Sequence, residues 1–95
     1  MITVNSRPVI LLKDLKAMCN SVGDHSYDNV FENLIDSILK QPENTAARRI
    51  LALFNGGMGS FNDFVLHKDG KVIADLMGTF DNERSKLYNW AIHRL

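Results

Sequence analysis

The segment TAARRILALFNGG, residues 45–57, decides the fold class, because it contains a strong helix that is cut short. Its alanines have high helix propensity and permit close packing against neighbouring helices. The two successive glycines then form a strong terminator. The segment therefore predicts a helix that is capped by Asn44 or Thr45, runs through residues 46–54 and ends where the chain reverses.

Two helices are predicted upstream of this segment, where apolar residues recur at helical spacing. The first covers about residues 8–22, since a proline fits the first turn of a helix and Gly23 supplies a stop. The second covers about residues 27–40, with Ser26 as its N-cap. Apolar residues alternate over residues 2–4, so a short strand at the start of the chain is an alternative prediction.

One β-hairpin is predicted downstream of the glycines. Residues 64–67 and 71–73 flank Lys68-Asp69-Gly70, and the Asp-Gly pair favours a tight turn. An isolated hairpin is only marginally stable in water, so we expect this one to pack on the helices.

A closing amphipathic helix completes the predicted fold. Its start stays open between Asp75 and Asp81. Its buried stripe is predicted from five apolar residues at helical spacing: Leu87, Tyr88, Ala91, Ile92 and Leu95. With no internal repeat or linker, residues 1–95 are expected to form a single domain. The predicted fold is mainly α, with about four packed helices and one small β-hairpin between the third and last helices.

The composition excludes several classes of protein. Eleven Lys and Arg balance eleven Asp and Glu, whereas a general nucleic-acid binder carries a basic excess. The one cysteine, Cys19, cannot form an internal disulfide, which favours a cytoplasmic location. The first residues lack the pattern of a signal peptide, and the longest apolar run, residues 8–12, is far shorter than the roughly 20 residues of a membrane span. We therefore expect a cytoplasmic protein that binds neither nucleic acid nor membrane directly.

The residues that most often support catalysis or metal binding are not arranged for either role. His25, His67 and His93 are far apart, and none has a second ligand at zinc-site spacing. Cys19 lies in an apolar helix, where a small buried side chain is its usual role. Ser60 lacks a Gly-x-Ser-x-Gly motif. We therefore expect no enzymatic activity, no metal and no cofactor.

The most distinctive segment is GGMGSFND, residues 56–63. A glycine-rich backbone can cradle an anion with its amides, but a P-loop would continue with Gly-Lys-Ser/Thr and a helix. A structural interpretation is favoured, in which the glycines reverse the chain, Met58 and Phe61 enter the core and polar side chains bond turn amides. This structural loop comprises Gly56, Gly57, Gly59, Ser60, Asn62 and Asp63.

Four residues are candidates for binding a partner. Asp28, Glu32 and Asp36 follow one another at i, i+4 and i+8 along one side of the second predicted helix, where like charges lower helix stability slightly. They form either a solvated face neutralised by a nearby basic side chain, which is somewhat more common, or a surface complementary to a basic partner. Trp90 falls outside the apolar stripe of the last helix, so it either covers the hairpin or is an exposed aromatic anchor.

Three motifs in the second half of the chain resemble a known family: AARRIL at residues 46–51, GGMGSFND at 56–63 followed by Val65-Leu66, and SKLY at 85–88. On these motifs the chain from Thr45 to Leu95 resembles an uncharacterised family of small bacterial domains. Trp90 stands where that family has a leucine in a closing Leu-Tyr-x-Leu-Ala pattern, which indicates a specialised surface. The family has no assigned enzymatic activity, so the resemblance implies the fold and leaves the function open.

The small size, the bacterial resemblance, the missing catalytic set and the acidic stripe together favour an immunity protein. Such a protein would bind a basic toxin domain, for example a nuclease of a contact-dependent growth-inhibition system, and occlude its active site. Two alternatives stay open. One is a non-enzymatic regulatory interaction module, either monomeric or a homodimer joined through helical faces, and the other is a small-ligand domain built around residues 56–63.

Overall fold

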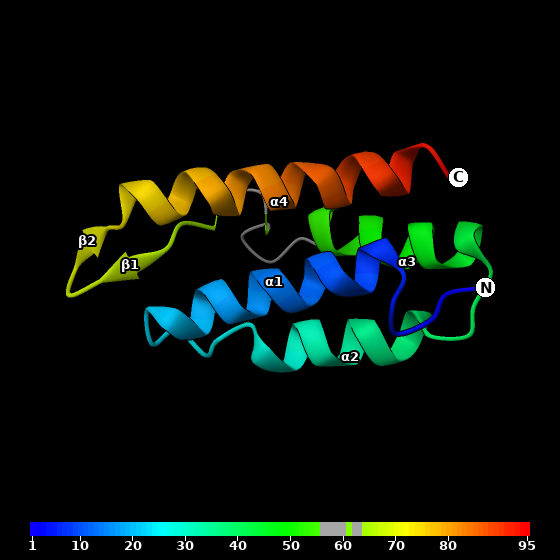
Figure 1. Cartoon of the computed structure of the whole chain (residues 1–95), viewed down its shortest axis with the longest axis horizontal. Helices are drawn as coiled ribbons and strands as arrows, with labels where there is room; N and C mark the ends of the chain where they lie inside the picture. The colour runs from blue at the N-terminus through cyan, green and yellow to red at the C-terminus, as the bar shows by residue number, and fades with distance from the viewer. Residues whose placement is uncertain (56–60, 62–63) are drawn as a thin grey trace.

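The computed structural model describes residues 1–55, 61 and 64–95 (Figure 1). These residues form four helices and a small antiparallel sheet, in the order α1 (Arg7–Ser21), α2 (Asp28–Ile38), α3 (Glu43–Asn55), β1 (His67–Lys68), β2 (Lys71–Val72) and α4 (Ala74–Ile92). The prediction of a mainly α fold with one small hairpin between the third and last helices is confirmed.

Consecutive helices run in opposite directions and pack as an elongated bundle of 40 × 22 × 21 Å (Figure 1). α4 packs against α1 and α3, and α2 packs against the same two helices from the other side. Short connections between α1, α2 and α3 favour this antiparallel arrangement. No helix in the described ranges combines the length and the apolarity that crossing a membrane requires.

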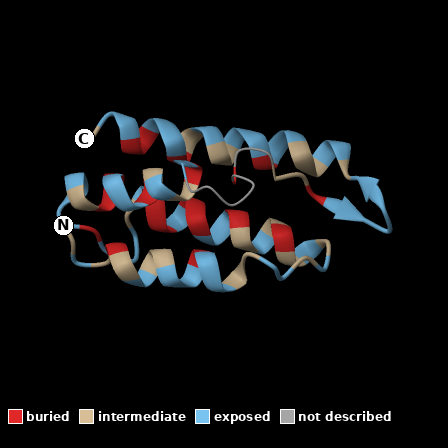
Figure 2. Ribbon diagram, turned by 180° about the vertical axis from the view of Figure 1, so that it is seen from behind, coloured by how far each residue is buried: buried red, intermediate tan, exposed pale blue. Residues whose placement is uncertain are grey.

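The apolar faces of the helices meet in one hydrophobic cluster along the bundle axis (Figure 2). Phe61, which is 1% exposed, lies among aromatic rings from α2, α3 and α4. Its ring centroid is 5.5–5.9 Å from those of Phe31, Phe54 and Phe80. The prediction that Phe61 enters the core is confirmed. Met58, predicted beside it, lies outside the described residues.

The start of the chain is not a strand. Ile2 is buried, and its backbone exchanges two hydrogen bonds with the connection between α2 and α3: its amide donates to the carbonyl of Gln41 at 2.9 Å, and the amide of Lys40 donates to its carbonyl at 2.8 Å. Ser26 is not the N-cap of α2 either, because the helix begins at Asp28 and the Ser26 side chain bonds Asp24 instead.

The hairpin is shorter and more exposed than predicted, with two residues in each strand. Asp69 (φ 54°) and Gly70 (φ 79°) both adopt left-handed backbone, as a tight two-residue hairpin turn requires. Only the base packs on the helices. There Leu66 is fully buried, and its amide lies 3.4 Å from the sulfur of Met77. Phe64 to Leu66 are therefore not part of a strand, and of the three only Leu66 is buried.

The last helix begins at Ala74, so the earlier of its two predicted starts is the correct region. Of the five residues of its predicted buried stripe, two are buried. Leu87 and Ala91 are buried, whereas Tyr88 and Ile92 are 39% and 40% exposed, and Leu95 lies beyond the helix in solvent. α4 is rotated so that Phe80, Leu87, Trp90 and Ala91 face α1 and α3.

Candidate partner-binding surface

The three carboxylates of α2 lie on one side of the helix, as predicted, and no Lys or Arg lies between Asp28 and Ile38. Their exposure differs. The side chain of Asp28 is 25% exposed, that of Glu32 is 52% exposed, and Asp36 is exposed. The helix therefore carries three carboxylates and no basic side chain of its own.

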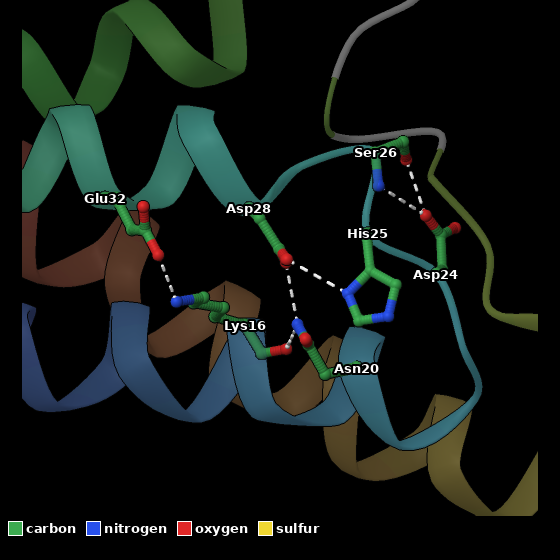
Figure 3. A network of polar contacts seen from close by, with 7 residues as sticks. All are labelled: Lys16, Asn20, Asp24, His25, Ser26, Asp28 and Glu32. Atoms are coloured by element: carbon green, nitrogen blue, oxygen red, sulfur yellow. Dashed lines mark hydrogen bonds and ion pairs between the residues drawn. The ribbon is translucent and has the colours of Figure 1, made fainter.

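Asp28 is tied to α1 and to the loop before α2 (Figure 3). Its Oδ1 accepts a hydrogen bond from Nδ2 of Asn20 at 2.7 Å, and its Oδ2 lies 3.0 Å from Nδ1 of His25. The bond from Asn20, followed by that from His25, holds the pKa of the Asp28 carboxyl below its usual value. Asp28 is therefore ionised at neutral pH and fixed in position.

Glu32 forms an ion pair with Lys16 of α1 (Figure 3). This hydrogen bond raises the pKa of Lys16, so the lysine keeps its charge at neutral pH. Neutralisation by a nearby basic side chain was the more common of the two predicted cases, and it holds for Glu32. Asp36 is different, because it is exposed and has no ion pair with another described residue.

Lys16 and Asn20 were missed by the sequence analysis. They are one turn apart on α1, beside the buried residues Leu15 and Cys19. That spacing places them on the edge of the apolar stripe, where a neighbouring helix passes. The position of Lys16 and Asn20 beside the apolar stripe could be read from the sequence, but the sequence does not say which helix packs against that edge of α1.

Replacing Asn20 by alanine should raise the pKa of Asp28 towards its ordinary value of 3.8, because the bond from Asn20 is the largest cause of the shift. Replacing His25 by alanine should also raise it, because the His25 ring supplies both a hydrogen bond and a charge to the carboxyl. An NMR titration of the Asp28 carboxyl measures both changes. An unchanged pKa of Asp28 in the Asn20 variant would contradict the hydrogen bond between these two side chains.

Trp90 is only 6% exposed, so the prediction of an exposed aromatic anchor is wrong. It does not cover the hairpin either, since the hairpin precedes α4 and Trp90 lies near the other end of that helix. The guanidinium of Arg94 lies 4.5 Å from its ring centroid and pairs with Glu43 at 3.0 Å. Trp90 is thus a core residue beneath an arginine that links α4 to the start of α3.

Arg84 is a third residue that sequence reasoning missed. Its Nη1 donates to the carbonyls of Phe61 and Phe64 at 2.7 and 2.9 Å, and its guanidinium lies over the rings of Phe61 and Phe80. Arg84 also pairs with Asp81. It therefore fastens the connection between α3 and β1 to α4. The predicted structural loop, Gly56, Gly57, Gly59, Ser60, Asn62 and Asp63, lies outside the described residues.

The remaining reactive side chains are inert or scattered. Cys19 is 1% exposed, as predicted, and burial raises the pKa of its thiol to about 12. His25, His67 and His93 are exposed. Within the described ranges, no three His, Cys, Asp or Glu side chains lie together in a group that could hold a metal ion.

Residues 20–74 match the family described as "Domain of unknown function (DUF6966)". The chain belongs to this family. The DUF6966 match runs from the end of α1 to the start of α4, so it includes Asn20, all of α2 and α3, and the hairpin. It also includes residues 45–74 of the stretch that carries the resemblance found in the sequence. No curated protein and no solved structure was found to match the chain.

Proposed function

We propose that this DUF6966 domain is a cytoplasmic immunity protein that binds and neutralises a cognate bacterial toxin with a basic active-site surface. One observation supports this function above the others. α2 presents three carboxylates and no cation of its own, and two of the three are held in fixed positions by α1 and the preceding loop.

Fixed charges favour binding because less conformational freedom is lost when the partner arrives. Lys16 orders Glu32, and Asn20 orders Asp28, before any partner is present. The side chain of Glu32 is still 52% exposed, so it can accept further hydrogen bonds from an arginine or a lysine. The network described above therefore prepares the acidic surface as well as joining α1 to α2.

Apart from Val30, which is 40% exposed, the solvent side of α2 is polar. Asn29 and Asn33 are exposed one turn apart, and Glu32 and Asp36 are exposed beside them. Amides donate and accept hydrogen bonds, whereas the carboxylates bind cationic side chains. A nuclease active site offers arginines and lysines that hold phosphates, and these are the groups this surface complements. Covering them would prevent the toxin from binding RNA or DNA.

Replacing Asp36 by lysine tests this function, because Asp36 is exposed and contributes to no described ion pair. The affinity for the toxin encoded by a neighbouring gene should fall by about 10–100-fold, and protection of cells that express this toxin should fall with it. Titration calorimetry and a growth assay measure the two effects.

The matched control is Asp14→Lys, which makes the same charge change at an exposed position of α1, beside a hollow between α1 and α4. This variant should bind the toxin like the unaltered protein. Equal affinity of both variants would remove α2 from the mechanism. No binding to the product of any neighbouring gene would reject the immunity function itself.

A further inference from the structure

One flank of α4 leaves apolar side chains in solvent. Residues 81, 85, 88 and 92 follow one another at i, i+4, i+7 and i+11, so they lie on the same side of the helix. Tyr88 and Ile92 are 39% and 40% exposed there, and the neighbouring Leu87 and Ala91 are buried against the bundle. We propose that a second copy of this chain docks on this flank, with the two α4 helices antiparallel about a two-fold axis.

The same flank is hollowed on one side of Tyr88. A hollow of about 440 Å³ lies between the end of α3 and the middle of α4, with Asp81, Ser85 and Tyr88 in its wall. The rings of Phe54 and Tyr88 form its apolar part, in edge contact with centroids 5.2 Å apart. The hollow is large enough for an aliphatic side chain, and it is open to solvent.

The hollow extends along α4 from Asp81 to Asn89, and Ile92 projects beyond that end of it. A two-fold axis between Ser85 and Tyr88 places Ser85 against Tyr88 of the other copy, and Ile92 against Asp81. Each Ile92 then enters the hollow of its partner, and the contact is self-complementary, as a two-fold interface requires. This match of a projection with a hollow on one flank selects a second copy as the occupant.

Charge at the two ends of the flank agrees with this pairing. α3 runs antiparallel to α4, and the contact between Phe54 and Tyr88 sets their register. Asn55 lines the hollow, so Arg48, two turns earlier, lies on the same side of α3 and level with the end of α4. The two-fold axis brings Arg48 of one copy towards Asp81 of the other, whose exposed carboxylate also pairs with Arg84 of its own chain.

Sedimentation equilibrium of the full chain tests the dimer. The unaltered chain should show a monomer–dimer equilibrium, and Ile92→Glu should raise its Kd by about 100-fold or more, because a two-fold interface receives each substitution twice. Ile10→Glu is the matched control, since Ile10 is 46% exposed on α1 and lies outside the flank. It should leave the Kd unchanged. A chain that stays monomeric up to about 1 mM, or a dimer that Ile92→Glu leaves intact, would overturn the proposal.

Spin labels on the dimer test its geometry. Cys19 is buried, so labels attached through Asn82→Cys and Asp75→Cys, both exposed positions, report on α4 alone. In the antiparallel pair the two labels at position 75 are farther apart than the two at position 82, by about 20 Å along the helix axis. Equal distances would indicate parallel helices and reject the arrangement. Toxin affinity should not change in Ile92→Glu, so failure of the dimer and failure of the α2 surface give different results.

Discussion

Replacing Phe61 by alanine is expected to lower the free energy of unfolding by about 3–5 kcal/mol. Phe61 is 1% exposed, and five aromatic rings surround it: Tyr27, Phe31, Phe54, Phe64 and Phe80. Alanine would leave a cavity between α2, α3 and α4, and it would remove the ring over which the Arg84 guanidinium lies. A domain of this size has a total stability of about 5–15 kcal/mol, so the variant would be only marginally folded.

Urea unfolding followed by circular dichroism measures this loss as a shift of the midpoint. Tyr88→Ala is the control, since Tyr88 also contacts Phe54 with its ring but is 39% exposed. It should lower the stability by about 1 kcal/mol or less. A loss of similar size for both variants would mean that Phe61 is not the centre of the aromatic cluster.

Alkaline pH is expected to destabilise the domain through Cys19, because burial raises the pKa of the thiol from 9.0 to about 12. Above pH 9 the unfolded chain loses the thiol proton, whereas the folded chain keeps it until about pH 12. The unfolded state therefore binds fewer protons in this window, and stability falls as pH rises. Below pH 9 the thiol is protonated in both states, and its full contribution to stability is present. Its loss by pH 12 is on the order of 4 kcal/mol.

Comparison with Cys19→Ala isolates this effect, since the tyrosines and lysines titrate in both proteins. Between pH 9 and pH 12 the free energy of unfolding of the unaltered chain should fall by about 4 kcal/mol relative to that of the Cys19→Ala variant. Native Cys19 should also resist thiol reagents at pH 8. A constant difference across this range would show that the thiol is accessible in the folded state.

The helices and the hairpin could be predicted because their signals are local. Apolar periodicity locates α1 and α2, the glycines after Asn55 mark the end of α3, and the Asp69-Gly70 pair marks the turn. The face of α4 could not be predicted in the same way. Phe80, Leu87 and Ala91 fit a helical stripe, but Leu87, Ala91 and Ile92 fit one too, and only packing on both α1 and α3 selects between them.

The candidate surface was predictable only in part, for a related reason. The spacing of Asp28, Glu32 and Asp36 fixes their common side within one helix. Their partners Lys16 and Asn20 belong to another helix, and the crossing of α1 with α2 decides which side chains meet. Trp90 shows the same limit, because its cover, Arg94, is held by Glu43 from the start of α3.

The hairpin tip offers a place to alter the molecule with little effect on the rest. Residues 67–72 are exposed, and Lys68 and Lys71 lie directly opposite each other, so their like charges lower the stability of the hairpin slightly. The hairpin is anchored to the bundle at Leu66, away from the tip. The tip belongs neither to α2 nor to the flank of α4. A peptide tag or a fluorescent protein inserted between Asp69 and Gly70 would therefore report on the intact domain inside a cell and leave both proposed contact surfaces free.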